Sequence, residues 1–303
     1  MKIAVTGSTG FVGKNLFAGL RQRGMSILPI GRKELSGSAE QLANTMQGCH
    51  AVINLAGAPI NQRWTPAHKQ RMVSSRLHTT CLLVESMRQM EKPPETFIST
   101  SAIGAFDSNG EYTESDPPNA SDFLGTLSMD WESAAIEAES LGVRTLIFRF
   151  ALVLGENGGL VKQLLTPFRL GLGGPVGDGK QHFSWVHIDD LVNAYLYALD
   201  HAEMSGVYHL CAPNPVTNLE FTRALGRALR RPTLLPVPGA MLKLIFGEGA
   251  EVMTSGQRVI SARLPEAGFS FRYQDIDAAV NAIVRQSGSG CYISDMTSSH
   301  SRS

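Results

Sequence analysis

The sequence of 303 residues has little cysteine, no excess of charge of either sign and no long apolar run. Its 4 cysteines lie far apart and include no C-x-x-C pair, so neither a disulfide framework nor a zinc site is predicted. Its 27 basic and 27 acidic side chains cancel, which argues against a nucleic-acid or membrane-surface partner. The first residues lack the pattern of a secretory signal, and no segment approaches the roughly 20 apolar residues of a membrane helix. These absences predict a cytoplasmic protein.

What the sequence does contain is 43% hydrophobic residues, enough for a core that needs no cross-link. Short apolar runs alternate with longer stretches of helical period, which is the pattern of a parallel sheet covered on both faces. The predicted strands are Lys2–Thr6, Ser26–Ile30, Ala51–Leu55, Thr96–Thr100 and Thr145–Phe150, and the predicted helices are Gly13–Arg23, Ala67–Glu91 and Gly125–Leu141. The fold class is therefore α/β, with a doubly wound sheet whose strand ends meet along one edge where a ligand can bind.

A glycine-rich turn follows the first predicted strand. Glycine lets the chain turn sharply, lets its amides approach a pyrophosphate and lets the next helix pack closely on the strand. The positive end of that helix then faces the anion. A plain turn would also hold glycines, but the position between a strand and a helix favours a dinucleotide. The predicted contacts are Gly7, Ser8, Thr9, Gly10, Phe11, Val12 and Gly13.

The second predicted strand ends at Gly31-Arg32-Lys33, where an NAD-specific site usually carries a carboxylate for the ribose 2′-hydroxyl. A carboxylate would repel a 2′-phosphate, whereas Arg32 can bind one through its fork of donors, so NADP(H) is favoured over NAD(H). The alternative is that both cations are solvated and pair with Glu34. The third strand runs into Asn54-Leu55-Ala56-Gly57, where small residues would let the adenosine or ribose lie against the backbone, although an ordinary strand-to-loop turn would have the same residues. The predicted contacts there are Leu55, Ala56 and Gly57.

We predict a nucleotide-binding core over residues 1–155. After Phe150 the alternation loosens and glycine and proline gather at residues 171–175 and 213–215. Residues 156–285 are expected to hold the remaining sheet elements and a smaller α/β lobe that covers a substrate. Residues 287–290 and 295–303 are small and polar, which predicts a disordered tail over residues 286–303.

Longer motifs stand beside the glycine turn: residues 54–60 with Arg63-Trp64, then Ser75-Arg76, Thr79-Thr80, residues 99–104, Trp131-Glu132, residues 185–190 and residues 267–269. Together they resemble the extended and atypical short-chain dehydrogenase/reductase superfamily, which includes sugar-nucleotide epimerases, and more closely its epimerase-family proteins of the YfcH type. The resemblance covers residues 1 to about 285. It implies a Rossmann-type sheet with NADP(H) across its carboxyl edge and a C-terminal lobe over an unidentified small-molecule substrate.

The resemblance also implies cofactor contacts from Ser99, from Arg76 on a helix that crosses near the cofactor, and from Phe150 at the end of a later strand. An exposed helix arginine and a core phenylalanine are the alternative interpretations of the last two. Extended members often pair through two helices, so a homodimer is an open expectation.

Conventional members use a serine, a tyrosine and a lysine four residues after the tyrosine, which lowers the pKa of the tyrosine and holds the ribose. Ser101 is placed at the end of its strand to bind the substrate oxygen. However, none of the six tyrosines has a lysine four positions later, and the family pattern puts Ser128 and Glu132 at the two positions. A serine hydroxyl is a far weaker acid than an activated phenol, so carbonyl reduction by that dyad is excluded.

Two hypotheses remain. In the first, the protein is an NADP-dependent oxidoreductase or epimerase-like enzyme in which Ser101 binds the substrate and Glu132 or another group handles the proton, unless the substrate is acidic enough to need no activated tyrosine. In the second, it binds NADP(H) without turnover as a sensor or interaction protein, and Glu132 only caps or pairs on its helix.

The run 182–190 holds two histidines and two carboxylates. Its spacing does not direct both imidazoles to one ion on a strand, so no metal site is predicted. We expect Asp189 or Asp190 to cap the next helix and the aromatic residues of the run to pack beneath the substrate lobe.

Overall fold

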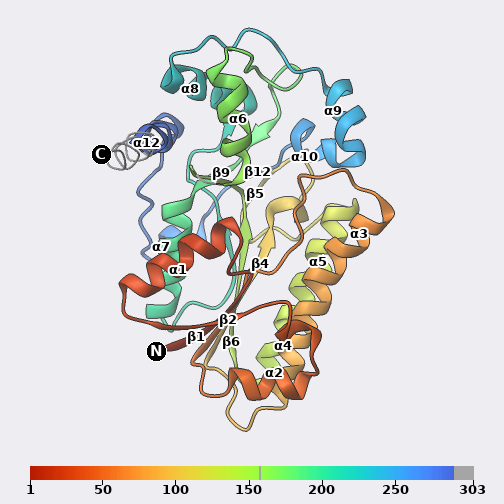
Figure 1. Ribbon diagram of the computed structural model, residues 1–303, viewed down its shortest axis with the longest axis vertical. Helices are drawn as coiled ribbons and strands as arrows, with labels where there is room; N and C mark the ends of the chain where they lie inside the picture. The colour runs from red at the N-terminus through yellow and green to blue at the C-terminus, as the bar shows by residue number, and fades with distance from the viewer. Residues whose placement is uncertain (157, 290–303) are drawn as a thin grey trace, which may run out of the picture.

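A computed structural model describes residues 1–156 and 158–289, without the side chains of residues 287–289. A parallel sheet of six strands lies at its centre, in the order β10-β6-β4-β3-β1-β2 (Figure 1). The strands are β1 (Lys2–Thr6), β2 (Ser26–Ile30), β3 (Ala51–Asn54), β4 (Thr96–Ala102), β6 (Arg144–Phe150) and β10 (Gly206–Leu210). The five predicted strands are all present with ends within two residues, and β10 is the strand that sequence analysis missed.

Helices cover both faces of this sheet, which confirms the doubly wound α/β class (Figure 1). On one face lie α1 (Phe11–Gln22) and α7 (Ile188–Asp200), whose buried side chains share a core with β1, β3 and β6. On the other lie α2 (Ala39–Met46), α4 (Thr79–Arg88) and α5 (Phe123–Ile136). Leu83 and Met87 show the helical spacing that turns one side of α4 towards the strands.

The predicted helix Ala67–Glu91 is divided by a change of helical type. It begins as α3 (Pro66–Val73), where the Thr65 hydroxyl accepts the His68 N–H and a proline takes the first position. A π-helical turn, Ser74–His78, then joins it to α4. Such wide turns are rare and often lie at functional sites. The predicted helix Gly125–Leu141 is α5 followed by a 3₁₀ turn, Glu137–Leu141.

The second half of the chain, together with β5 from the first half, adds a lobe of short elements above the sheet (Figure 1). Its paired strands are β5 (Glu111–Tyr112) with β12 (Arg258–Val259), β7 (Leu152–Leu154) with β9 (Trp185–His187), and β8 (His182–Phe183) with β11 (Val216–Thr217). Its helices are α6 (Gly159–Arg169), α8 (Asn218–Leu229), α9 (Gly239–Phe246), α10 (Glu251–Thr254) and α12 (Ile276–Ser289), whereas α11 (Arg263–Glu266) packs against β10 through Leu264. Phe183 and Trp185 are buried in its core, as the aromatic residues of that run were expected to be.

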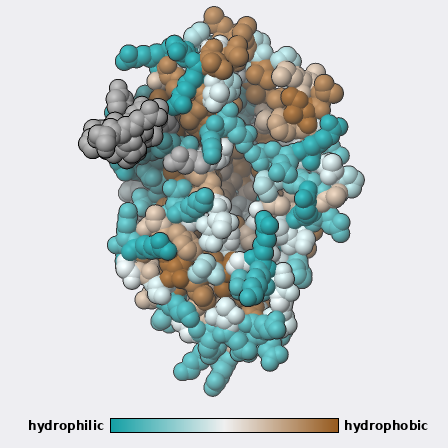
Figure 2. Space-filling view, in the orientation of Figure 1, coloured by the Kyte–Doolittle hydropathy of each residue, from teal (hydrophilic) through white to brown (hydrophobic). Residues whose placement is uncertain are grey.

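The surface of the lobe is apolar over α9, in the area that Figure 2 shows as hydrophobic at the upper right. Met241, Leu244 and Ile245 are exposed there. Among the described residues, no helix is both long and apolar enough to cross a membrane.

The predicted tail from residue 286 is corrected at its start, because α12 continues to Ser289. Its buried face, Ala279, Val280 and Ile283, packs in the same core as α8, and a helix that is anchored in this way extends past its last apolar residue. Residues 290–303 of the predicted tail lie outside the described residues.

The expected capping of α7 by Asp189 or Asp190 is wrong. The cap is His187, whose Nδ1 accepts the Asp189 N–H at 3.1 Å. The fully buried Asp190 instead accepts the N–H groups of Arg272 and Tyr273 at 2.7 and 2.9 Å. An imidazole nitrogen can accept a hydrogen bond as an oxygen can, so the carboxylate is free to bind the later segment.

His187 makes the stability of the fold depend on pH. The ring is fully buried, and this burial lowers the pKa of His187 to about 4, well below the unfolded value near 6.5. Between pH 6.5 and 4 the unfolded chain binds a proton on this histidine that the folded chain does not bind. The free energy of unfolding therefore decreases as the pH is lowered, by up to about 1.4 kcal/mol per pH unit. We expect His187→Asn, which keeps an oxygen for the cap, to flatten this slope when unfolding by urea is measured at pH 7, 6 and 5. If the free energy of unfolding of the variant depends on pH as steeply as that of the wild-type protein, His187 is not the group responsible.

Candidate functional site

The glycine turn between β1 and α1 is packed so closely that side chains have no room. Gly7 has a φ of +66°, and a Cβ on it would lie 2.4 Å from the Leu55 carbonyl oxygen. A Cβ on Gly13 would lie 2.3 Å from the Gly7 carbonyl oxygen. The Gly10 N–H closes the turn by donating to that same oxygen at 3.0 Å. Glycine at positions 7 and 13 is therefore a requirement of the backbone itself.

The amino end of α1 is left bare. Gly10 is the N-cap, no side chain caps the helix, and its first turn holds no acidic residue. The first N–H groups of a helix have no partner within it and carry its positive end. Thr9 and Gly10 are exposed and Ser8 is half-buried, so an anion can reach this end. The cradle fits the phosphates of a dinucleotide.

Two further predicted contacts in this turn are apolar. Val12 is half-buried against the core of α1 and α7. The Phe11 ring is also half-buried, and Cβ atoms on Gly155 and Gly158, in the loop after β7, would lie within 2.6 Å of it. The lobe thus closes on the first turn of α1.

Arg32 and Lys33 follow β2, beside β1, and both are exposed. The Glu34 carboxylate accepts a hydrogen bond from the Gly31 N–H at 2.8 Å. Hydrogen bonds from backbone amides, first its own and then that of Gly31, lower the pKa of Glu34. Within the described ranges neither cation forms an ion pair, although the charge of Lys33 also lowers the pKa of Glu34. Both cations are exposed, as the alternative of solvated surface residues also requires.

Hydrogen bonds tie the loop after β3 to the glycine turn. The Thr6 hydroxyl accepts the N–H groups of Leu55 and Ala56, both at 3.1 Å, and donates to Asn54 Oδ1 at 2.7 Å. Asn54 Nδ2 in turn donates to Thr80 Oγ1 at 2.8 Å. The small residues predicted to contact the cofactor are therefore held next to the turn.

Arg76 lies beside Gly57, in the π-helical turn. Its Nη2 donates to Ala58 O at 3.1 Å and its Nη1 to Met72 O at 3.3 Å, while the guanidinium stands 5.3 Å from the centre of the Trp131 ring. A Cβ on Gly57 would lie 3.1 Å from the Arg76 Cζ, so this glycine admits the arginine. Burial lowers the pKa of Arg76 to about 10. The side chain is partly buried, which contradicts the alternative of an exposed helix arginine.

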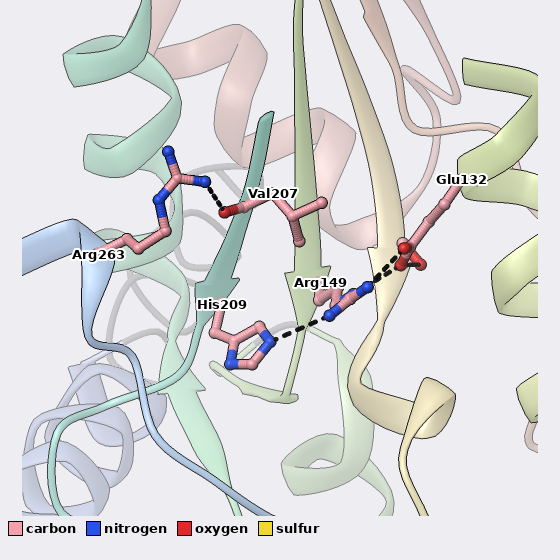
Figure 3. A network of polar contacts seen from close by, with 6 residues as sticks. Glu132, Arg149, Val207, His209 and Arg263 are labelled. Atoms are coloured by element: carbon pink, nitrogen blue, oxygen red, sulfur yellow. Dashed lines mark hydrogen bonds and ion pairs between the residues drawn. The ribbon is translucent and has the colours of Figure 1, made fainter. Parts of the chain in front are cut away.

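A row of polar residues crosses the sheet on the face covered by α5. Ser101 on β4 pairs with Arg149 on β6, which pairs with His209 on β10. Glu132 of α5 reaches this row (Figure 3). Its Oε1 accepts from Ser101 Oγ at 2.6 Å and from Arg149 Nε at 2.7 Å, and its Oε2 accepts from Arg149 Nη2 at 2.7 Å. None of the four side chains is more than 7% exposed.

The hydrogen-bond partners of this polar row determine which of its atoms carry protons. Burial lowers the pKa of His209, so its ring is neutral, with Nδ1 donating to Ile260 O at 3.0 Å and Nε2 accepting from Arg149 Nη1 at 3.4 Å. Ser101 gives its only proton to Glu132, so towards a ligand its hydroxyl can only accept. Glu132 is neither a cap nor a free acid, because a bidentate guanidinium neutralises it.

Three other predicted or aligned positions lie inside the protein. Ser99 is buried, and its hydroxyl has no partner in the part of the chain that the structure describes. Phe150 is half-buried, with its ring 6.1 Å from that of Tyr195, so it contributes to the core. Ser128 is buried on α5, one turn before Glu132. Contact of Ser99 and Phe150 with a cofactor stays a prediction.

Sequence analysis missed Arg149 and His209. A signal for the first is present, because Arg149 interrupts the apolar run of its strand between two phenylalanines. A cation in a strand buried on both faces requires a partner. No such signal marks His209, which lies on the strand that was itself missed.

Comparison with known proteins agrees with this geometry. The model of the NAD-dependent epimerase/dehydratase family matches residues 3–211, and that of a domain of unknown function, DUF1731, matches residues 237–283. The human epimerase family protein SDR39U1 is 35% identical over 294 residues, which span 94% of this chain and 100% of that protein. The chloroplastic homologue of SDR39U1 from Arabidopsis thaliana is 36% identical over 306 residues, 94% of this chain and 87% of that protein.

Solved structures extend the likeness to three dimensions. The crystal structure of human SDR39U1 (isoform 2) with NADPH has a TM-score of 0.86 at 33% identity and covers 94% of this chain and 99% of that one. The UDP-glucose 4-epimerase of Thermotoga maritima with UDP-glucose has a TM-score of 0.78 at 18% identity, covers 96% of this chain and 100% of its own, and shares the fold alone. The resemblance to epimerase-family proteins with a Rossmann-type sheet is confirmed. By its family model and its relatives, the chain belongs to the NAD-dependent epimerase/dehydratase family.

Proposed function

We propose that the protein binds NADP(H) along the carboxyl edge of its sheet. The observation that carries this proposal is the bare amino end of α1 over the glycine turn, next to Arg32, which forms no ion pair among the described residues. The turn of residues 7–13 would hold the pyrophosphate, and Gly31, Arg32 and Lys33 would hold the 2′-phosphate. The human relative solved with NADPH supports this choice of cofactor.

We further propose an NADP(H)-dependent oxidoreductase or epimerase-like activity that does without a Tyr-x-x-x-Lys dyad. The bound cofactor would supply the hydride donor or acceptor. Ser101 can only accept a hydrogen bond, so it suits a substrate hydroxyl better than a carbonyl oxygen. Glu132 orients Ser101, and Arg149 holds Glu132. Because Ser128 stands where the phenol would be, either a group other than a phenol handles the proton or the substrate itself carries a readily lost one.

The same ion pair favours a second candidate function, NADP(H) binding without turnover by a sensor or interaction protein. Both oxygens of the Glu132 carboxylate are engaged within the protein, by Arg149 and Ser101, so the residue already has a structural role that needs no substrate. The absorbance of the reduced cofactor, followed with a panel of alcohols and carbonyl compounds, separates the two functions. A change in absorbance supports an oxidoreductase. An epimerase returns its cofactor to the starting state, so the silent protein is supported only by binding with neither a change in absorbance nor a chemically altered substrate.

A cytoplasmic location, a homodimer and the absence of nucleic-acid and membrane partners stay predictions. The Arabidopsis relative is named as a chloroplastic protein, so location does not follow from the family.

Arg32→Glu tests the cofactor. We expect the Kd for NADPH to rise by about a hundredfold, because a charge-assisted fork becomes a repulsion, while the Kd for NADH changes by less than about threefold. Titration calorimetry of both dinucleotides measures this. Arg21→Glu is the control, since Arg21 is exposed in the last turn of α1 and the change in charge is the same. Equal losses for the two dinucleotides would refute the phosphate role.

A further inference from the structure

Thr80 and Trp131 belong to the sequence motifs, but the proposed function gives neither of them a role. Thr80 lies in the first turn of α4 and is fully buried, and Trp131 on α5 is 5% exposed. A buried helical threonine commonly donates its hydroxyl to the carbonyl four residues earlier. Thr80 Oγ1 does so, to Arg76 O at 2.7 Å. Its oxygen has further partners, however, and these lie on other elements.

The Thr80 hydroxyl accepts two hydrogen bonds besides the one that it donates. Asn54 Nδ2, at the end of β3, donates to it at 2.8 Å, and Trp131 Nε1, on α5, also donates at 2.8 Å. A hydroxyl has one proton and two acceptor sites, so the hydrogen-bonding capacity of Thr80 is fully used. A single buried oxygen therefore joins the π-helical turn, the end of β3 and α5.

Towards the glycine turn, Thr80 fixes the orientation of the Asn54 amide. Because the Thr80 proton is given to Arg76 O, only the Nδ2 side of the amide can face this hydroxyl. Asn54 Oδ1 is then directed to the Thr6 hydroxyl, at 2.7 Å, and to the Ala56 N–H, at 3.3 Å. Thr6 directly precedes the glycine turn, so this amide holds the turn and the loop after β3 together.

Towards α5, Thr80 supplies the acceptor that the indole of Trp131 requires inside the protein. Trp131 directly precedes Glu132, whose Oε1 accepts from Ser101 Oγ at 2.6 Å. The contact therefore determines where the helix that carries Glu132 lies against the loop after β3. The proposed cofactor cradle and the pair of Ser101 and Glu132 are positioned from the same oxygen atom.

We infer that Thr80 is a positioning residue of the proposed site, which holds the loop after β3 and α5 in the places that NADP(H) binding requires. The residue acts through Asn54 and Trp131 and does not need to touch the cofactor. This inference rests on the proposed binding of NADP(H), but the hydrogen bonds themselves can be tested without the cofactor.

Thr80→Val keeps the shape of the side chain and removes the hydroxyl, so two buried donors lose their acceptor. We expect the Kd for NADPH in titration calorimetry to rise by about tenfold. We also expect hydrogen exchange of the Leu55 and Ala56 amides, measured without cofactor, to become about tenfold faster, because their acceptor Thr6 is no longer held in place. Thr80→Ser restores the hydroxyl and should stay within about threefold of the wild-type protein in both measurements.

Thr145→Val is the matched control, because it also removes a buried threonine hydroxyl, which donates to Val143 O at the amino end of β6. We expect this variant to lower the free energy of unfolding but to leave the Kd for NADPH and the exchange of the two amides unchanged. A purely structural role of Thr80 would give the same result for Thr80→Val.

The outcomes separate the inference from the proposed function. If the wild-type protein does not bind NADPH, the proposed function fails, and the exchange rates alone decide whether Thr80 holds the two loops. If Thr80→Val changes neither measurement more than Thr145→Val does, or if Thr80→Ser recovers neither, the positioning role is overturned. Should Thr80→Val not fold, Trp131→Phe removes one of the two donors and should still raise the Kd for NADPH by at least about threefold.

Discussion

Glu132→Ala is expected to lower the free energy of unfolding by about 3–5 kcal/mol. The substitution leaves the Arg149 guanidinium, which is only 4% exposed, without its counter-charge, and it removes the acceptor of the Ser101 hydroxyl. A buried charge that loses its partner costs more than the pair contributed when complete. Urea denaturation followed by circular dichroism gives the change directly.

The control is Glu139→Ala, an exposed glutamate at the end of the same helical segment, for which we expect a change within about 0.5 kcal/mol. Adding Arg149→Met to Glu132→Ala should recover part of the loss, because the stranded charge is then gone. A loss no larger than that of the control would show that the pair does not stabilise the sheet.

The second large effect is expected at Gly7. Gly7→Ala adds a Cβ to a residue with a φ of +66° and brings it within 2.4 Å of the Leu55 carbonyl oxygen. Both loops must move apart, so the amides at the start of α1 no longer face a common anion. We expect the affinity for NADPH to fall on the order of a hundredfold, the equivalent of one or two charge-assisted hydrogen bonds. Calorimetric titration measures this loss.

Gly24→Ala separates backbone strain from the clash. Gly24 has nearly the same φ, +68°, but a Cβ there would meet nothing within 4 Å. This variant should lose about 1 kcal/mol of stability and keep its affinity for NADPH. If Gly7→Ala behaves in the same way, the close approach of the two loops does not shape the site.

The glycine turn could be predicted from the sequence because all its determinants are local. An apolar strand, glycines at fixed spacing and a helical period follow one another within Lys2–Thr6 and Phe11–Gln22. The other four predicted strands were found for the same reason, because each contains a short, mostly apolar run. β10 was not, since a glycine and a histidine interrupt its five residues.

The polar row could be predicted only in part. Ser101 and Glu132 follow from the family pattern, but their bond to each other depends on how α5 lies across β4 and β6. The partner of Glu132 is 17 residues further along the chain, on a different element, and nothing local selects it. Of the roles left open for Glu132, the structure shows an ion pair, with Arg149 on another element, and a role in handling a proton stays a prediction.

The hydrogen bonds of the Asp190 carboxylate bear on whether the segments that match the two family models can be separated from each other. Asp190 belongs to the segment that matches the epimerase/dehydratase model, yet it binds the amides of Arg272 and Tyr273, in the segment that matches DUF1731. Cutting the chain between the two segments would leave the buried Asp190 carboxylate at the start of α7 without its hydrogen-bond partners. It would also expose to solvent the core that α12 shares with α8. Neither portion is a free-standing building block, so gene fusion or shuffling has to carry both together.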